Sequence, residues 1–112
     1  MYWKEIPAQV QAIGDDGTVS PPMDPRFQEG IDAIAMFEGS AGTDDYMDAW
    51  EWRDVGELAG DAADVSQQVT DHLNSQFPQD FVARIRDSHR AGNRDITPGS
   101  LDEWSGGVLP PG

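Results

Sequence analysis

A run of closely spaced acids is the densest group of side chains in this sequence that is suited to chemistry. The acids are Asp44, Asp45, Asp48 and Glu51. On a helix most of them would lie near one face, and a hard divalent cation requires several oxygen ligands at close range. Their spacing does not match a calcium-binding loop, however, and acids at a helix start are already stabilised by the helix dipole. We therefore interpret the run as a solvated helix start and predict no metal site.

The other residue types that take part in catalysis form no recognisable constellation. His72 and His89 are the only histidines, and their separation places them on different predicted helices. The Asp15-Asp16-Gly17 stretch lacks the later ligands of a calcium loop and is typical of a turn. The sequence has no cysteine, no serine in a Gly-x-Ser-x-Gly frame and no glycine-rich phosphate loop. So many carboxylates leave an acid-pair hydrolase open, but nothing marks a particular pair. We predict a non-enzymatic protein without a cofactor.

Charge divides the chain into two unequal parts. The 112 residues include seven basic and twenty-one acidic side chains, for a net charge of −14. Residues 1–80 hold three of the basic and seventeen of the acidic side chains, whereas residues 81–112 hold four of each. A surface this negative repels phosphate backbones, so we expect no nucleic-acid binding. Acid-rich, lysine-poor surfaces also fit proteins that stay hydrated in high salt, so salt adaptation is one hypothesis and ordinary solubility the other.

Length and hydropathy limit the class of protein. A chain of this length suits one domain. It contains no run of 18 or more apolar residues, so we expect no membrane span. The first residues lack the basic and apolar blocks of a signal peptide, so we expect a cytoplasmic location.

The clearest structural signal is a helix that begins after Asp24. Asp24 is suited to the N-cap position, and Pro25 is suited to the first helical position. The apolar stripe at the helical period consists of Phe27, Ile31, Ile34, Ala35 and Met36. Gly39 predicts the end of the helix. Gly30 lies in the middle, where simple tolerance at about 1 kcal/mol is the favoured interpretation and close approach of another backbone is the alternative.

Two further helix starts are indicated by capping residues. Thr43 is suited to cap a short helix through its hydroxyl group, with acids in the first turn. Asp61 is suited to cap a longer helix, with Asp64 at the third position. The apolar stripe of that longer helix consists of Val65, Val69 and Leu73. A last short helix is expected from about Pro78, with the apolar residues Phe81, Val82 and Ile85.

Alternating patterns predict the strands. Residues 2–13 alternate as one strand, in which Pro7 indicates a sheet edge or a bulge. The turn at residues 14–17 leads to a second short strand, and residues 50–58 are expected to form a third with Trp50 and Trp52 on one face. We therefore predict an α+β fold, with a three-stranded antiparallel sheet and two to three helices packed on one face. A mostly helical domain with one hairpin is the alternative.

The composition predicts three parts of the chain. Residues 1–78 form a compact α+β domain, residues 79–92 a short basic helix and residues 93–112 a flexible C-terminal tail, since the tail has too little apolar content to fold alone. We therefore expect a chain that ends at Gly92 to fold. The arginine group at residues 84–94 is expected to fold back on the acidic body, with an anionic partner as the alternative.

Four blocks of sequence resemble a known family. They are Ile6-Pro7-Ala8-Gln9-Val10, Arg26-Phe27-Gln28-Glu29 with Ile31-Asp32, Gly42-Thr43-Asp44 with Tyr46, and Trp50. In order and spacing these blocks resemble the small prokaryotic virulence factor domain over residues 2–78. A similar domain lies in the middle of conserved virulence factor C proteins, between an iron–sulfur scaffold segment and HEAT-like repeats. Gly30, where alanine is expected, and the doubled proline at 21–22 depart from the pattern.

The resemblance implies an accessory or interaction domain and assigns no catalytic residue. We predict that a protein partner binds at the sheet edge near Pro7, at Trp50 and Trp52, and at a docking segment around Leu101 and Trp104. Core packing is the other interpretation of Trp50 and Trp52. The alternative function, which the resemblance only hints at, is a small subunit or ligand binder of an enzyme system in one-carbon (folate or corrinoid) or iron–sulfur metabolism.

Overall fold

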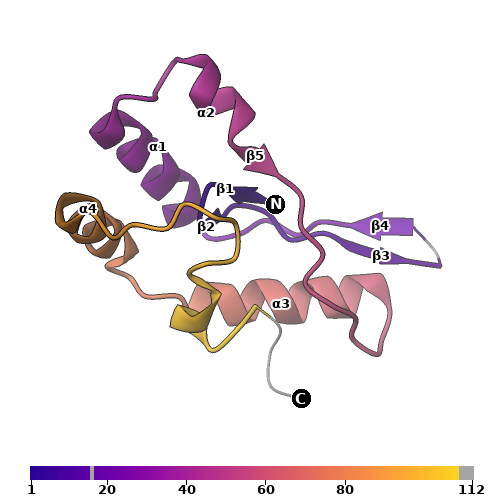
Figure 1. Ribbon diagram of the computed structural model, residues 1–112. Coiled ribbons are helices and arrows are strands. Elements are labelled where there is room, and N and C mark those ends of the chain that lie inside the picture. Colours follow the sequence, from indigo (N-terminus) through magenta and orange to yellow (C-terminus); the bar gives the residue numbers. More distant parts are fainter. Residues whose placement is uncertain (16, 109–112) are drawn as a thin grey trace.

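Helices and short strands alternate along the chain in a computed structural model, which describes residues 1–15 and 17–108. Figure 1 shows their arrangement. The strands are β1 (Tyr2–Trp3), β2 (Ile6–Pro7), β3 (Ala12–Gly14), β4 (Gly17–Val19) and β5 (Trp50–Glu51). The helices are α1 (Arg26–Glu38), α2 (Asp44–Asp48), α3 (Ala62–Gln76), α4 (Phe81–Ala91) and the 3-10 helix η1 (Asp102–Ser105). The predicted α+β class is therefore confirmed.

The strands form two small antiparallel sheets. One has the order β2-β1-β5, with Tyr2 paired to Pro7 on one side and to Glu51 on the other. The second is the hairpin β3–β4, in which Gly14 pairs with Gly17 around the predicted turn. Figure 1 shows this hairpin extending away from the first sheet, alongside α3. The expected three-stranded antiparallel sheet is present, but only β5 comes from the segments predicted as its second and third strands.

The single strand predicted for residues 2–13 is wrong, because the chain reverses inside it. Lys4 has a positive φ of 50°, and the turn that it forms with Glu5 pairs β1 with β2. A non-glycine residue with positive φ is uncommon and is maintained by its surroundings. Here both neighbours of the turn, Trp3 and Ile6, are completely buried. Pro7 lies in the edge strand β2, as its missing N–H predicted.

The third strand is also shorter than the predicted residues 50–58. It ends at Glu51, because Glu51 already pairs with Tyr2 and β1 offers only one residue beyond that point. Residues 52–58 have no regular secondary structure and are exposed up to residue 57. The ladder therefore ends where its partner strand ends, and the following segment runs alone to α3.

Two of the three predicted helix caps are confirmed. Pro25, directly before α1, already has helical backbone angles, so Asp24 takes the capping position, and its Oδ1 atom accepts a hydrogen bond from the Arg26 N–H at 3.0 Å. The Asp61 Oδ1 atom accepts one from the Asp64 N–H at 2.8 Å. Thr43 occupies the position before α2, but its hydroxyl donates back to the Ser40 carbonyl at 2.6 Å and caps nothing. The preceding turn competes for the same hydroxyl group, which is a common behaviour of threonine.

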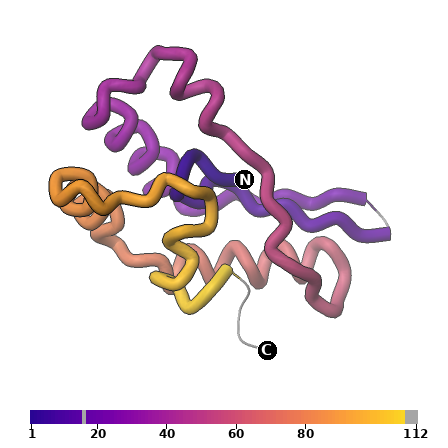
Figure 2. Tube along the Cα trace, in the orientation of Figure 1, coloured from indigo at the N-terminus to yellow at the C-terminus, as the bar shows by residue number. Residues whose placement is uncertain are grey.

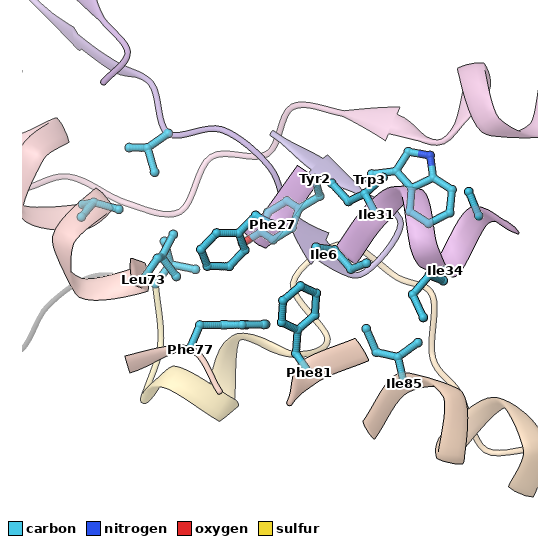
Figure 3. Close-up of a cluster of buried hydrophobic side chains, with 14 residues drawn as sticks. Tyr2, Trp3, Ile6, Phe27, Ile31, Ile34, Leu73, Phe77, Phe81 and Ile85 are labelled. Atoms are coloured by element: carbon cyan, nitrogen blue, oxygen red, sulfur yellow. The ribbon is translucent and has the colours of Figure 1, made fainter. Parts of the chain in front are cut away.

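The core lies between α1, α3, α4 and the first sheet, and Figure 3 shows its central side chains. Phe27, Phe77 and Phe81 form an aromatic group with ring centroids 5.5–5.8 Å apart. The predicted stripe of α1 is buried except for Met36, which is 74% exposed, so that part of the prediction is wrong. A Cβ added to Gly30 would lie 2.2 Å from the Phe81 ring. Close approach therefore explains Gly30, although a side chain and not a backbone makes it.

The residues expected outside the compact domain are packed against it. Phe81 and Ile85 of α4 are buried in the core, and Val108 closes part of it. The Trp104 ring lies 6.1 Å from the Phe77 ring, and the Tyr2 hydroxyl donates to the Asp102 carboxylate at 3.0 Å. Figure 2 shows the orange segment after α4 running back across the molecule before η1. The boundaries predicted at residues 78 and 92 therefore do not separate a folded part from a loose part within residues 1–108. Residues 109–112 of the predicted tail lie outside the described residues.

Candidate interaction groove

Two adjoining hollows lie between the β3–β4 hairpin and the segment that follows β5. Their volumes are about 540 Å³ and about 320 Å³. The walls that both hollows share are Val10, Gln11, Ile13, Arg53, Asp54, Val55 and Val69. We call the two hollows together the hairpin groove. Their sizes fall at the lower to middle part of the range of roughly 300–1,000 Å³ that is usual for ligand sites.

One wall of the hairpin groove is set by local turn chemistry. Gly14 and Gly17 close the hairpin, and a Cβ on Gly14 would lie 3.2 Å from the Ala62 Cβ atom at the start of α3. The absence of a side chain at Gly14 therefore allows the hairpin to lie close against α3. Val69 of α3, which is buried, forms the floor between the two walls.

The opposite wall is residues 52–58, which are attached mainly at their two ends. β5 pairs with β1 before the segment, and the Asp61 cap starts α3 after it. Between residues 53 and 60, no backbone N–H or C=O makes a hydrogen bond to another residue that the structure describes. This wall therefore presents free backbone groups to the groove and to solvent.

Three large apolar side chains are exposed along the hairpin groove. Ile13 is 81% exposed, Trp52 is 48% exposed and Val55 is 41% exposed. Beneath them the floor is continuous with the core through Leu73 and Val108. Single exposed apolar residues are normal on a protein surface, but several around one concave site are typical of an interaction surface.

The rim of the groove is mainly acidic. Asp54 and Glu57 line it, Asp15 follows the lining residue Gly14, and all three acids are exposed. Arg53 also lies on the rim, where its Nε atom is 3.4 Å from the Glu51 carboxylate. The groove thus combines apolar side chains with a predominantly negative border.

The structure brings together two of the five residues predicted to bind a partner. Pro7 and Trp52 both line the smaller hollow, although Pro7 is buried. Trp50 is half-buried, packs edge-on against Tyr46 and lines a separate hollow beside Pro21 and Pro22.

Leu101 and Trp104 lie away from the groove and pack on the protein itself. Both are partly buried against the core, and the Arg84 guanidinium lies 5.4 Å from the Trp104 ring centroid. Their surroundings therefore differ from the free docking segment that the tail composition predicted.

Ile13 and Val55, two of the three exposed apolar residues of the groove, were not predicted from the sequence. In the alternation predicted for residues 2–13, Ile13 shares the polar face with Gln9 and Gln11. An isoleucine on a polar face was the signal that could have found it. Val55 carries no comparable signal, since its environment depends on where the segment after β5 crosses the hairpin.

A buried group of four charged side chains lies outside the groove and was also missed. Arg94 forms a bidentate ion pair with Glu5, with both N–O distances at 2.7 Å. Its Nη1 atom lies 2.6 Å from a Glu38 oxygen. Lys4 pairs with the other Glu38 oxygen, which also accepts from Ser40. Two acids therefore balance two bases, and Arg94 has folded back on the acidic body as predicted.

The pKa shifts of Glu38 and Arg94 agree with this balance of opposite charges. Burial alone would raise the pKa of Glu38, but hydrogen bonds from Lys4, Ser40 and Arg94 together hold it below its ordinary value. Burial would likewise lower the pKa of Arg94, but the hydrogen bonds and charges of Glu5 and Glu38 raise it. Both shifts favour the charged forms of Glu38 and Arg94, so the group acts as a structural tie.

Titratable side chains elsewhere are dispersed. His72 lies on α3 with its Nε2 atom 3.0 Å from the Gly107 carbonyl, and His89 lies on α4 against Phe37, as the separate-helix prediction required. Across residues 1–15 and 17–108, no three His, Asp or Glu side chains gather as metal ligands would.

Within the same residues, no helix is both long and apolar enough to cross a lipid bilayer.

Comparison with known proteins identifies the family. The family model described as virulence factor matches residues 1–85, which include both walls of the hairpin groove and the floor residue Val69. No curated protein and no solved structure matches significantly. The matched family is a virulence factor domain and not a known enzyme family. Because the match covers more than half of its length, this chain belongs to the virulence factor family.

Proposed function

We propose that this chain is a non-enzymatic accessory domain that binds a protein partner in the hairpin groove. The observation that carries the proposal is the gathering of Ile13, Trp52 and Val55, all exposed, around one concave site. Burying apolar surface contributes roughly 25 cal/mol per Å², and exposed apolar side chains beside a pocket are where such a gain is available.

The composition of the groove favours a protein over a small polar metabolite. Tryptophan is enriched among the residues that dominate binding energy at protein interfaces. Three deeply buried charged side chains, Glu5, Glu38 and Arg94, are paired with one another away from the groove. The groove therefore supplies apolar contact and a charged rim, which is the usual anatomy of an interface.

Two groove variants and one control variant test the proposal. Ile13→Asp and Val55→Asp place a charge on the exposed apolar wall, whereas Met36→Asp makes the same change at an exposed residue of α1 that does not line the groove. Each protein is immobilised and incubated with lysate of the source organism, and the retained proteins are quantified by mass spectrometry. Circular dichroism melts establish that all three variants are folded.

We expect one stoichiometric partner that the unmodified chain and Met36→Asp retain and that both groove variants lose. Retention of the same partner by the groove variants would contradict the proposal. A native mass spectrum of the isolated chain provides a second readout. A bound small molecule in that spectrum, displaced by either groove substitution, would favour the ligand-binding alternative instead.

A further inference from the structure

The β3 wall of the hairpin groove is an open sheet edge. The residues Gln11, Ala12, Ile13 and Gly14 line the groove, whereas β4 is not among its lining residues, so the groove lies on the side of β3 that faces away from β4. In an antiparallel pair, alternate residues direct their N–H and C=O groups away from the partner strand. Among the described residues β3 pairs with β4 only. The groove is therefore bordered by unpaired donors and acceptors, which are a template for another strand.

The facing wall also has free backbone groups. Arg53, Asp54, Val55 and Gly56 line the groove, and their backbone atoms make no hydrogen bond to any other described residue. Figure 2 shows this segment passing once from β5 to α3 across the base of the hairpin. An extended segment placed in the groove would thus meet unpaired backbone on β3 and further polar backbone opposite.

The side chains define what such a segment would carry. Successive side chains of a strand point to opposite faces, so one face of an added strand can meet Ile13 and Val55 while the other faces solvent and the acidic rim. The exposed acids Asp54 and Glu57 favour positive charge at the rim-facing positions. A net charge of −14 attracts cations over a distance of about 8 Å at physiological salt and also speeds their association.

The same charge disfavours a second copy of the chain as the occupant. Self-association through the groove would bring two molecules of charge −14 together at their acidic rims. Resting on the proposed function, we infer that the partner presents a cationic, extended segment with alternating apolar residues, and that this segment binds the hairpin groove as a strand added to β3.

A matched set of synthetic peptides tests the inference. The probe alternates lysine and valine over about six residues, the usual length of a strand. One control replaces every lysine with glutamate. A second keeps the lysines but carries N-methyl groups on the valines, which removes backbone donors along one edge of the strand. Binding is measured by calorimetry at low and at physiological salt, and amide NMR shifts locate the site.

We expect the lysine–valine peptide to bind at least about tenfold more tightly than either control, more weakly as salt rises, with shifts at residues 11–14 and 53–56. The double variant Asp54→Asn/Glu57→Gln is expected to weaken binding several-fold. The double variant Glu29→Gln/Asp45→Asn removes the same charge from exposed positions that do not line the groove and is expected to have a smaller effect.

Equal binding of the N-methylated or the acidic peptide would overturn the inference, as would no binding of any peptide at millimolar concentration. Dimerisation of the chain that Ile13→Asp abolishes would assign the groove to a second copy and also overturn it. These failures are separate from failure of the proposed function. A natural partner that needs Ile13 and Val55 but binds as a helix or through an acidic segment would leave that function standing.

Discussion

Arg94 and Glu5 form a buried bidentate ion pair although they are 89 residues apart in the sequence. The Glu5 side chain is only 1% exposed, and it lies in the turn between β1 and β2. The pair therefore ties the segment after α4 to the first hairpin of the chain. Glu38, at the end of α1, joins the same arginine, so one guanidinium connects three separate parts of the molecule.

Replacing Arg94 is expected to destabilise the protein strongly. Arg94→Ala leaves Glu5 buried without a partner, and breaking a buried pair from one side costs about 3–5 kcal/mol. The measurement is the free energy of unfolding in urea. Arg90→Ala is the control, since its pair with Asp87 is exposed and is worth no more than about 1 kcal/mol. Similar losses in the two variants would show that the buried pair contributes little.

Truncation after Gly92 is expected to impair folding, in contrast to the expectation from composition. The shorter chain lacks Arg94, and it also lacks Leu101, Trp104 and Val108, which pack on the core. Urea unfolding followed by circular dichroism measures the effect. A truncated chain that unfolds cooperatively with unchanged stability would mean that these contacts are not needed in solution.

Gly30→Ala is expected to destabilise the protein even though alanine favours helix. The new Cβ atom would lie 2.2 Å from the Phe81 ring, and overpacking of this kind costs typically about 1–3 kcal/mol. The gain in helix propensity is only about 1 kcal/mol. Thermal melts of Gly30→Ala alone and with Phe81→Leu make the comparison. The smaller leucine should recover part of the loss relative to Phe81→Leu alone, and strictly additive effects would rule out the proposed clash.

Acid is expected to remove the stabilising contribution of Glu38. Its folded pKa is lowered, because hydrogen bonds to its carboxylate outweigh the effect of burial. The contribution is therefore complete above the ordinary value of 4.5 and is lost as the pH falls from there through the folded pKa. Urea midpoints between about pH 7 and about pH 3 test this.

Two variants separate Glu38 from the other acids in this measurement. Glu38→Gln should flatten the acid branch of the curve, since its side chain no longer titrates. Asp102 has the opposite sign, because burial raises its pKa despite the hydrogen bond from Tyr2. Its replacement by asparagine should make the acid loss steeper. An acid branch that is the same in Glu38→Gln and the unmodified chain would contradict the assignment.

Added salt is expected to stabilise the protein. Most of the acids at positions 44–64 are exposed and lack a basic partner among the described residues, and their mutual repulsion is screened as the Debye length falls from about 10 Å at 0.1 M to about 3 Å at 1 M. Thermal melts in sodium chloride measure the effect. Greater stability at low salt would contradict it and would also remove the hypothesis of salt adaptation.

The features that could be predicted from the sequence are those with local causes. The Asp24 and Asp61 caps, the glycine end of α1 and the Gly14–Gly17 turn each depend on residues within one or two turns of chain. The buried stripes of α1 and α3 follow from a period of 3.6 residues, so they too were visible. The helical composition and the α+β class rest on these features.

The features that could not be predicted depend on contacts between residues that are distant in the sequence. The reversal at Lys4 could not be seen in an alternating pattern, because Glu5 is buried only through its pairing with Arg94. Nothing in the sequence near Trp104 indicates that its ring packs beside Phe77. The hairpin groove likewise forms only because the segment after β5 crosses β3. Caps, turns and periodic stripes need only neighbours along the chain, whereas burial of a charge or the opening of a groove depends on surfaces that fold together from separate segments.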